Sequence, residues 1–228
     1  MFPAQLTDGY RAFLDDRFIR EQERFEDLAK SGQKPQVMII GCCDSRVSPE
    51  TIFNARPGEM FVVRNVGALI PPYEPDNELA GTHHGTSAAL EFAVEALKVE
   101  HIVVLGHARC GAMRAFADDA TEPLSPGDFI GRWIRLVLPA AERTGGRGVH
   151  ETLTVYIERL ALASVESSIS NLRSFPWIKQ LEDEGKLQLH GAYFDVATGV
   201  LMVLEPDTGH FVPAVATMPK RVSMIRCV

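Results

Sequence analysis

The sequence predicts an α/β protein with a mostly parallel central β-sheet flanked by helices. Short apolar runs of the kind found in buried strands are separated by a strongly helical segment, which gives the order strand, crossover helix, strand. The 228 residues are 46% hydrophobic, enough for one well-packed core. No stretch resembles an interdomain linker. We therefore expect a single domain over residues 1–228, including a helical arm at residues 1–32.

The N-terminal segment predicts a long helix. Thr7 and Asp8 are good N-cap residues, and Gly32 is a stop signal for a helix that runs to about Lys30. Apolar residues recur at helical spacing along one face, while the other face is dense with Arg, Glu and Asp. Such a stripe is usually packed against something, so we expect it to cover the core or a partner subunit.

Two apolar runs, at residues 36–41 and 61–66, predict buried strands, and a Pro57-Gly58 turn precedes the second. Residues 87–97 predict a helix, and residues 101–105 a third buried strand.

The second half of the chain predicts further helices and a hairpin. Pro and Gly mark two loops, at residues 121–127 and 143–148. The remaining expected elements are helices at residues 129–142 and 151–172 and hairpin strands at residues 187–196 and 200–204.

Composition excludes several classes of protein. A net charge of -7 argues against nucleic-acid binding, which needs clustered Lys and Arg for phosphate contacts. The longest apolar runs fall far short of the roughly 20 residues of a membrane span, and the N-terminus lacks the pattern of a signal peptide. Four cysteines are too few for a disulfide scaffold in a chain of this size, so we expect a reduced, cytoplasmic protein.

Two short segments carry the residue types of a metal site. Gly-Cys-Cys-Asp-Ser-Arg at residues 41–46 follows the first predicted strand, and Gly-His-Ala-Arg-Cys-Gly at residues 106–111 follows the third. Because sites in parallel α/β sheets form at the carboxyl ends of strands, we expect both segments to open onto one crevice.

Within these segments, spacing suggests which side chains converge. An extended backbone points Cys42, Asp44 and Arg46 the same way. A helical turn starting at the glycine before His107 places His107 and Cys110 on one face. Two thiolates and one imidazole make a three-ligand zinc site with an open fourth position, as in catalytic zinc centres. Zinc there lowers the pKa of a bound water to about 7.

The neighbouring charged residues then acquire roles. Asp44 either binds zinc directly or accepts a hydrogen bond from zinc-bound solvent, and Arg46 pairs with Asp44 and holds it off the metal. Each motif by itself also fits a buried thiol beside a salt bridge, or a merely buried His and Cys. Their occurrence together at two strand ends favours the metal site. Cys43 should point away from Cys42 and be a small buried residue.

These segments resemble the defining motifs of the β-class carbonic anhydrases, Cys-x-Asp-x-Arg followed by His-x-x-Cys. The resemblance extends over nearly the whole chain and includes residues 57–66, 87–111, 171–173 and 191–195. It implies reversible hydration of CO2 to bicarbonate and a proton by zinc-bound hydroxide. The implied zinc ligands, one ion per chain, are Cys42, His107 and Cys110, with Asp44 and Arg46 as the family's dyad.

The resemblance also implies an active site at a dimer interface. By offset from the motifs, the family's substrate pocket corresponds to Gln33, Phe61, Val66 and Phe92. The first helix wraps the partner subunit in this family, so an obligate dimer is expected, and tetramers or octamers stay open. Ile39 stands where allosteric members have a Trp of a second, inhibitory bicarbonate site. Although Arg64 is present, we therefore expect the open, non-cooperative type.

Two alternatives remain open at this point. Relatives on the same scaffold hydrolyse carbon disulfide or carbonyl sulfide, and the ligands do not separate these substrates from CO2. A non-catalytic zinc protein or a thiol-redox protein that uses Cys42 and Cys110 is the other alternative.

Overall fold

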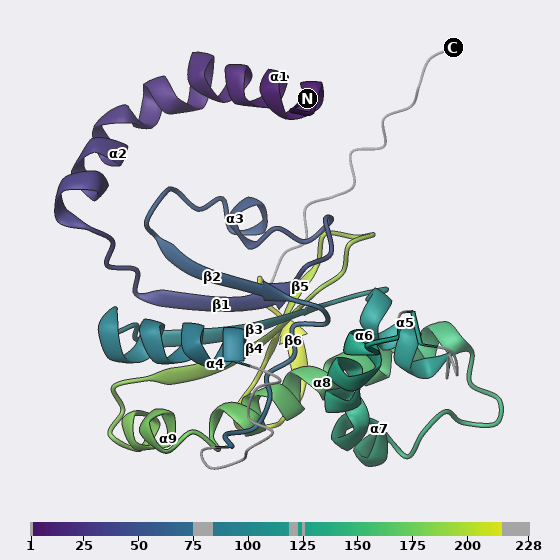
Figure 1. The fold of residues 1–228 in the computed structure, drawn as a ribbon. Helices are drawn as coiled ribbons and strands as arrows, with labels where there is room; N and C mark the ends of the chain where they lie inside the picture. The colour runs from purple at the N-terminus through teal and green to yellow at the C-terminus, as the bar shows by residue number, and fades with distance from the viewer. Residues whose placement is uncertain (1, 75–83, 119–122, 125, 216–228) are drawn as a thin grey trace.

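A computed structural model describes residues 2–74, 84–118, 123–124 and 126–215, and its centre is a six-stranded sheet (Figure 1). The strand order is β2-β1-β3-β4-β5-β6. The first four strands in this order are parallel and the last two pairings are antiparallel, which confirms the predicted mostly parallel sheet. The strands are β1 (Val37–Cys42), β2 (Met60–Asn65), β3 (His101–His107), β4 (Gln188–Phe194), β5 (Leu201–Leu204) and β6 (Phe211–Pro213).

Helices cover one face of this sheet and crowd the end where β1 and β3 finish. Figure 1 shows α4, α8 and α9 beneath the sheet, α3 above it, and α5 to α7 grouped beyond the ends of the strands. The main core lies between the sheet and α4, α8 and α9. These helices are α3 (Pro49–Ile52), α4 (His84–Glu91), η3 (Phe92–Ala96), α5 (Gly111–Ala117), α6 (Phe129–Ile134), η4 (Arg135–Val137), α7 (Leu138–Thr144), α8 (Leu153–Leu172) and α9 (Pro176–Asp183).

The predicted strands are confirmed to within two residues at each end. The helix predicted at residues 129–142 is instead α6, η4 and α7 in succession, and α7 ends at Gly145 in the left-handed region with φ 72°. The loop predicted at residues 143–148 therefore begins two residues later than expected, after the end of α7. Part of the loop predicted at residues 121–127 lies outside the described residues. The short elements α3, α5, α9 and β6 were not predicted, because three to eight residues carry little periodicity.

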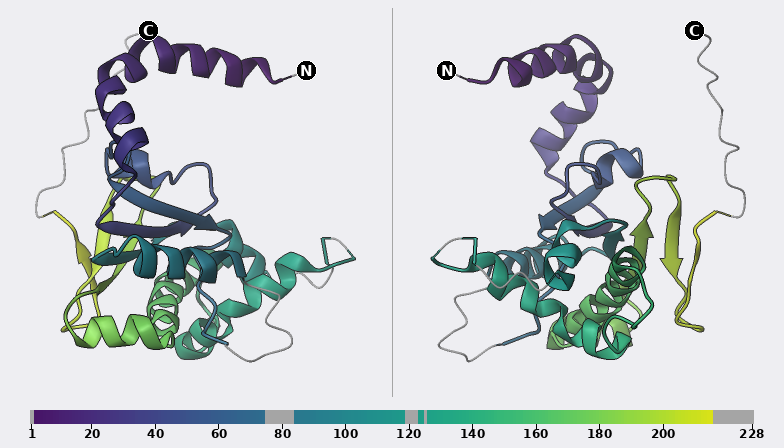
Figure 2. Two further views of the ribbon diagram at one scale, coloured as in Figure 1. Left: turned by 60° about the vertical axis from the view of Figure 1, so that its left-hand side comes forward. Right: turned by 90° about the vertical axis from the view of Figure 1, so that its right-hand side faces the viewer.

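The N-terminal arm consists of α1 (Ala4–Ala12), η1 (Phe13–Phe18) and α2 (Ile19–Ser31). The predicted start was wrong: the helix begins at Ala4, because the carbonyl of Pro3 accepts from the amides of Leu6 and Thr7. The predicted stop is confirmed, with Gly32 at φ 76°. The arm projects from the body (Figure 2), and none of the residues in these three segments is buried. Its apolar stripe therefore does not pack on the core of its own chain.

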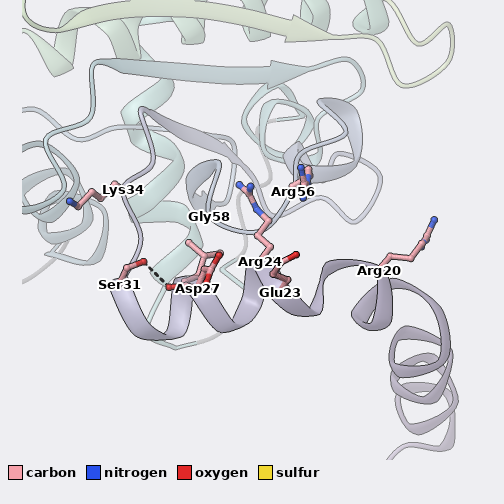
Figure 3. Close-up of a pocket in the computed structure, with 10 residues that line it drawn as sticks. Arg20, Glu23, Arg24, Asp27, Ser31, Lys34, Arg56 and Gly58 are labelled. Carbon is pink, nitrogen blue, oxygen red and sulfur yellow. Dashed lines mark hydrogen bonds between the residues drawn. The ribbon is translucent and has the colours of Figure 1, made fainter.

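The arm meets the body at the turn predicted before β2. Arg24, one of the residues that line the pocket drawn in Figure 3, donates from Nε to the carbonyl of Pro57 at 2.6 Å. Gly58 has φ 82°, and a Cβ atom there would lie 2.7 Å from a methyl carbon of Leu28. The positive φ and the close approach both favour glycine at this position.

Within the described ranges, no helix combines the length and apolar character that a membrane span requires.

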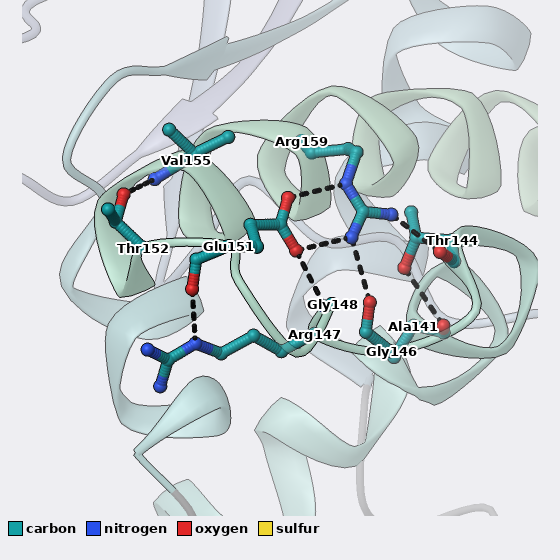
Figure 4. Close-up of polar contacts among 9 residues, drawn as sticks. All are labelled: Ala141, Thr144, Gly146, Arg147, Gly148, Glu151, Thr152, Val155 and Arg159. Carbon is teal, nitrogen blue, oxygen red and sulfur yellow. Dashed lines mark hydrogen bonds and ion pairs between the residues drawn. The ribbon is translucent and has the colours of Figure 1, made fainter.

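The connection between α7 and α8 is closed by an ion pair (Figure 4). Arg159 donates to both carboxylate oxygens of Glu151, at 3.0 and 2.8 Å, and to the carbonyls of Thr144 and Gly146. The amide of Gly148 donates to the same carboxylate at 3.0 Å. The Arg159 guanidinium and then this amide lower the pKa of Glu151 to about 2.

We expect Glu151→Gln to lower the melting temperature at neutral pH by a few degrees. Because the folded-state pKa is depressed, the carboxylate stabilises the fold fully above its unfolded pKa, near 4.5, and this contribution is lost as the pH falls through about 2. Thermal melts should therefore show the variant approaching the parent as the pH drops. The control is Glu142→Gln, an exposed glutamate with no ion pair among the described residues. A variant difference that does not change with pH contradicts the assignment.

Candidate metal centre

The structure brings the three predicted metal ligands together. Cys42 is the last residue of β1, His107 is the last residue of β3, and Cys110 is the N-cap of α5. The two Sγ atoms and a ring nitrogen of His107 all lie within 4.8 Å of one another, and all three side chains are buried. This is the geometry of a possible metal site with two sulfur ligands and one nitrogen ligand.

Strand pairing accounts for this convergence. β1 and β3 are adjacent and parallel, with Gly41 paired to Leu105, so their carboxyl ends lie side by side. The predicted helical turn from Gly106 was wrong, because β3 continues through His107. A Cβ atom at Gly106 would lie 2.6 Å from Val165 of α8, so the strand packs closely on that helix. The chain then reverses at Arg109, with φ 56°, and α5 starts after Cys110.

The imidazole of His107 leaves one nitrogen for a metal. Its Nδ1 donates to the carbonyl of Ala108 at 2.9 Å, which fixes the tautomer and puts the lone pair on Nε2. Nε2 is buried and has no hydrogen-bond partner among the described residues. Burying a hydrogen-bond acceptor without a partner costs folding free energy, and a cation bound to the acceptor removes that cost. The donor set therefore fits a metal ion.

A hydrogen bond joins the two thiols. The pKa of Cys42 is lowered, chiefly because the thiol of Cys110 donates to its sulfur, and the backbone amides of Asp44 and Gly67 lower it further. The pKa of Cys110 is raised by the same bond and by burial. A bound cation favours ionisation of both thiols.

Asp44 and Arg46 form the predicted pair beside this centre. Arg46 donates from Nε to Oδ1 at 2.9 Å and from Nη2 to Oδ2 at 2.7 Å. The extended backbone expected here was wrong, since the chain turns after Asp44 and the amide of Arg46 also donates to Oδ1. The guanidinium holds the pKa of Asp44 well below its usual range. Arg46 also donates to the carbonyl of Arg109 at 3.2 Å and so links the two motif loops.

Arg64 supports the first motif in a way that the sequence did not reveal. It donates from Nε to the carbonyl of Cys42 at 2.8 Å and from Nη2 to the carbonyl of Asp44 at 2.7 Å. These bonds fix the backbone on both sides of Cys43. The expectation that Cys43 is buried was wrong, because its side chain is exposed at an open cleft.

The four pocket residues are not all brought together. Val66 lines the cleft beside Cys43, but Phe61 pairs with Met38 near the amino end of β2, with its ring 5.9 Å from that of Phe92. Gln33 likewise precedes the amino end of β1, while the ligands lie at the carboxyl end. Six strand residues at about 3.3 Å each separate the two ends by roughly 20 Å. Gln33 therefore does not reach the metal centre of its own chain.

The comparisons agree on one family. Residues 37–201 match the family model described as carbonic anhydrase. A carbonic anhydrase of Pseudomonas aeruginosa is 33% identical over 207 residues, which cover 91% of this chain and 90% of that protein. The chloroplastic β carbonic anhydrase 5 of Arabidopsis thaliana is 35% identical over 190 residues, 83% of this chain and 60% of that relative's length.

Solved structures show the same similarity. The β-carbonic anhydrase CcaA is 29% identical, with a TM-score of 0.82 over 93% of this chain and 92% of that one. A tetrameric β-carbonic anhydrase from Sordaria macrospora is 28% identical, with a TM-score of 0.72 over 91% and 97% of the two chains.

Proposed function

The chain belongs to the β-class carbonic anhydrases, a family of enzymes, and from that premise we propose that it hydrates CO2 reversibly to bicarbonate and a proton with one zinc ion per chain. The observation that carries this proposal is the convergence of Cys42, His107 and Cys110 around the unpartnered Nε2 of His107. No relative or structure named above is described as a carbon disulfide hydrolase or a redox protein, so the comparisons do not support those alternatives.

Zinc, when held by these three ligands, supplies a nucleophilic hydroxide at neutral pH, because it lowers the pKa of water to about 7. Asp44 is ionised and therefore only accepts hydrogen bonds. We assign its carboxylate to accept the remaining proton of the nucleophile, so that a lone pair points at CO2. Arg46 holds Asp44 through two bonds and keeps that carboxylate from becoming a fourth ligand.

The surroundings of Arg64 and Ile39 support the open, non-cooperative type. Arg64 already donates to two backbone carbonyls, and Ile39 is buried in the sheet with 2% exposure, which leaves no aromatic partner for a second bicarbonate at that position. The absence of an inhibitory site, the single domain and the cytoplasmic location stay predictions.

We assign Val66, beside Cys43, to the CO2 pocket of its own chain. The Phe61–Phe92 pair lies near the amino end of β2, so we assign it to the pocket of a second copy, where apolar side chains suit an apolar gas. Gln33 would then serve the active site of a second copy, because it lies far from the ligands of its own chain. Self-association is also supported by the uncovered apolar stripe of the N-terminal arm and by the tetrameric relative. Dimers and tetramers both fit these observations.

We expect Gln33→Ala to lower kcat/KM about fivefold while zinc content and assembly stay unchanged. The reason is the loss of one hydrogen bond to a CO2 or bicarbonate oxygen, about 1 kcal/mol. Gln36→Ala is the matched control, since Gln36 is also an exposed glutamine just before β1. Equal kcat/KM values for both variants would remove Gln33 from the pocket.

The proposed function is tested by stopped-flow CO2 hydration on protein whose zinc content is assayed in the same batch. Fast hydration with about one zinc per chain, rising with pH through a single ionisation, is the expected result. Zinc-loaded protein without hydration at any pH from mildly acidic to mildly alkaline overturns the proposal and leaves only the metal site.

A further inference from the structure

One peptide group joins helix α6 to a metal ligand. The carbonyl of Val66 accepts a hydrogen bond from Nε1 of Trp133 at 2.6 Å. The amide of the same peptide, on Gly67, donates to Sγ of Cys42 at 3.4 Å. We propose that Trp133 is a positioning residue of the metal centre: its indole N–H fixes the Val66–Gly67 peptide so that the amide is aimed at the Cys42 sulfur. The inference rests on the proposed metal site.

The Val66–Gly67 peptide can rotate between two orientations. The amide of Ala68 approaches the carbonyl of Asn65 at 3.5 Å, which makes residues 65–68 a β-turn with Val66–Gly67 as its central peptide. Gly67 has φ 87° while Val66 is not among the positive-φ residues, the pattern of a type II turn. A type I turn with the same ends has its central peptide rotated, and its amide then points away from the sulfur.

Gly67 permits the type II orientation but also allows type I, so the turn residues alone do not fix the central peptide. The side chain of Asn65 accepts from the amide of Leu69 at 2.9 Å and donates to its carbonyl at 2.8 Å, so it fixes the ends of the turn. Trp133, by contrast, binds the central carbonyl itself. The indole also packs against the buried cluster that includes Cys42 and Cys110, so its position is set by the core around the ligands.

The hydrogen bond also has an electrostatic consequence. An amide that donates to a thiolate withdraws electron density from the sulfur, and a donor on the other end of the peptide strengthens that amide. Partners of this kind orient metal ligands and tune their basicity, and their removal typically lowers metal affinity or activity about 10- to 100-fold. Loss of the indole N–H should therefore raise the energy of the sulfur electrons. It should also weaken metal binding, because the Cys42 sulfur is no longer held in position.

The experiment uses the full-length protein, stripped of metal and reloaded with Co²⁺. In Trp133→Phe we expect the thiolate-to-cobalt charge-transfer band to move to longer wavelength and cobalt affinity, measured by chelator competition, to fall about 10- to 100-fold. The control is Trp177→Phe in α9, whose ring packs on Phe175 at 5.4 Å, remote from the ligands. A Trp133→Phe spectrum and affinity equal to those of the parent would overturn the inference.

A second measurement needs no change at Trp133. The chain has two tryptophans, so ¹⁵N-tryptophan labelling gives two indole N–H signals, which Trp177→Phe assigns. We expect the Trp133 signal, and not the Trp177 signal, to shift between the zinc and cadmium forms. An unmoved Trp133 signal contradicts the inference. Neither readout requires CO2 turnover, so a metal-binding but inactive parent would sink the proposed function and leave this inference standing.

Discussion

Cys42→Ser is expected to lose metal and CO2 hydration together. A serine hydroxyl is a poor substitute for a thiolate as a zinc ligand, and the sulfur it replaces is one of the two in the ligand group. Only His107 and Cys110 would remain. We expect zinc to fall from about one per chain to a small fraction and kcat/KM to fall at least roughly 10³-fold, since no nucleophile forms at neutral pH.

The neighbouring residue gives a matched control. Cys43→Ser makes the same chemical change one position along the chain, at an exposed thiol that is not in the ligand group. It should keep both zinc and activity. Metal assay and stopped-flow hydration on the two variants separate a ligand from a nearby cysteine. Full zinc content in Cys42→Ser would show that Cys42 is not a ligand.

The parts of the fold that sequence analysis predicted are those that local patterns encode. Apolar runs bounded by Gly and Pro gave the strands, and two segments placed after adjacent parallel strands gave the convergence of Cys42, His107 and Cys110. The path between the last two ligands was wrong, because spacing by three residues fits a helical turn as well as a strand end followed by a left-handed residue.

The missed features depend on contacts between distant segments. Arg64 binds backbone 20 and 22 residues away, and Trp133 binds the carbonyl of a residue 67 positions earlier. Neither residue lies in a motif, so no spacing rule identifies it. Similarly, the offset that placed Gln33 in the pocket cannot show whether it serves its own chain. That distinction depends on the direction of β1 and on where the arm lies.

Asp44→Asn is expected to keep zinc and lose most turnover. Asparagine has nearly the same shape, but its amide nitrogen donates where the carboxylate accepted, so at least one of the three bonds from Arg46 is lost and the charge is removed. The nucleophile would no longer be held with a lone pair toward CO2. Loss of a positioned proton acceptor lowers kcat about 10²-fold or more. KM should change little, because CO2 binds to the apolar wall.

The pH dependence separates this role from an ordinary titrating base. Because Arg46 holds the pKa of Asp44 well below its usual range, the carboxylate is fully ionised from mildly acidic to alkaline pH. The ratio of parent to variant kcat should therefore be constant over that range. Asp183→Asn, which removes the same charge from an ion pair on α9, should have no effect. Zinc-loaded Asp44→Asn with near-normal turnover would remove Asp44 from its assigned role, and loss of zinc would make it a structural support of the ligands instead.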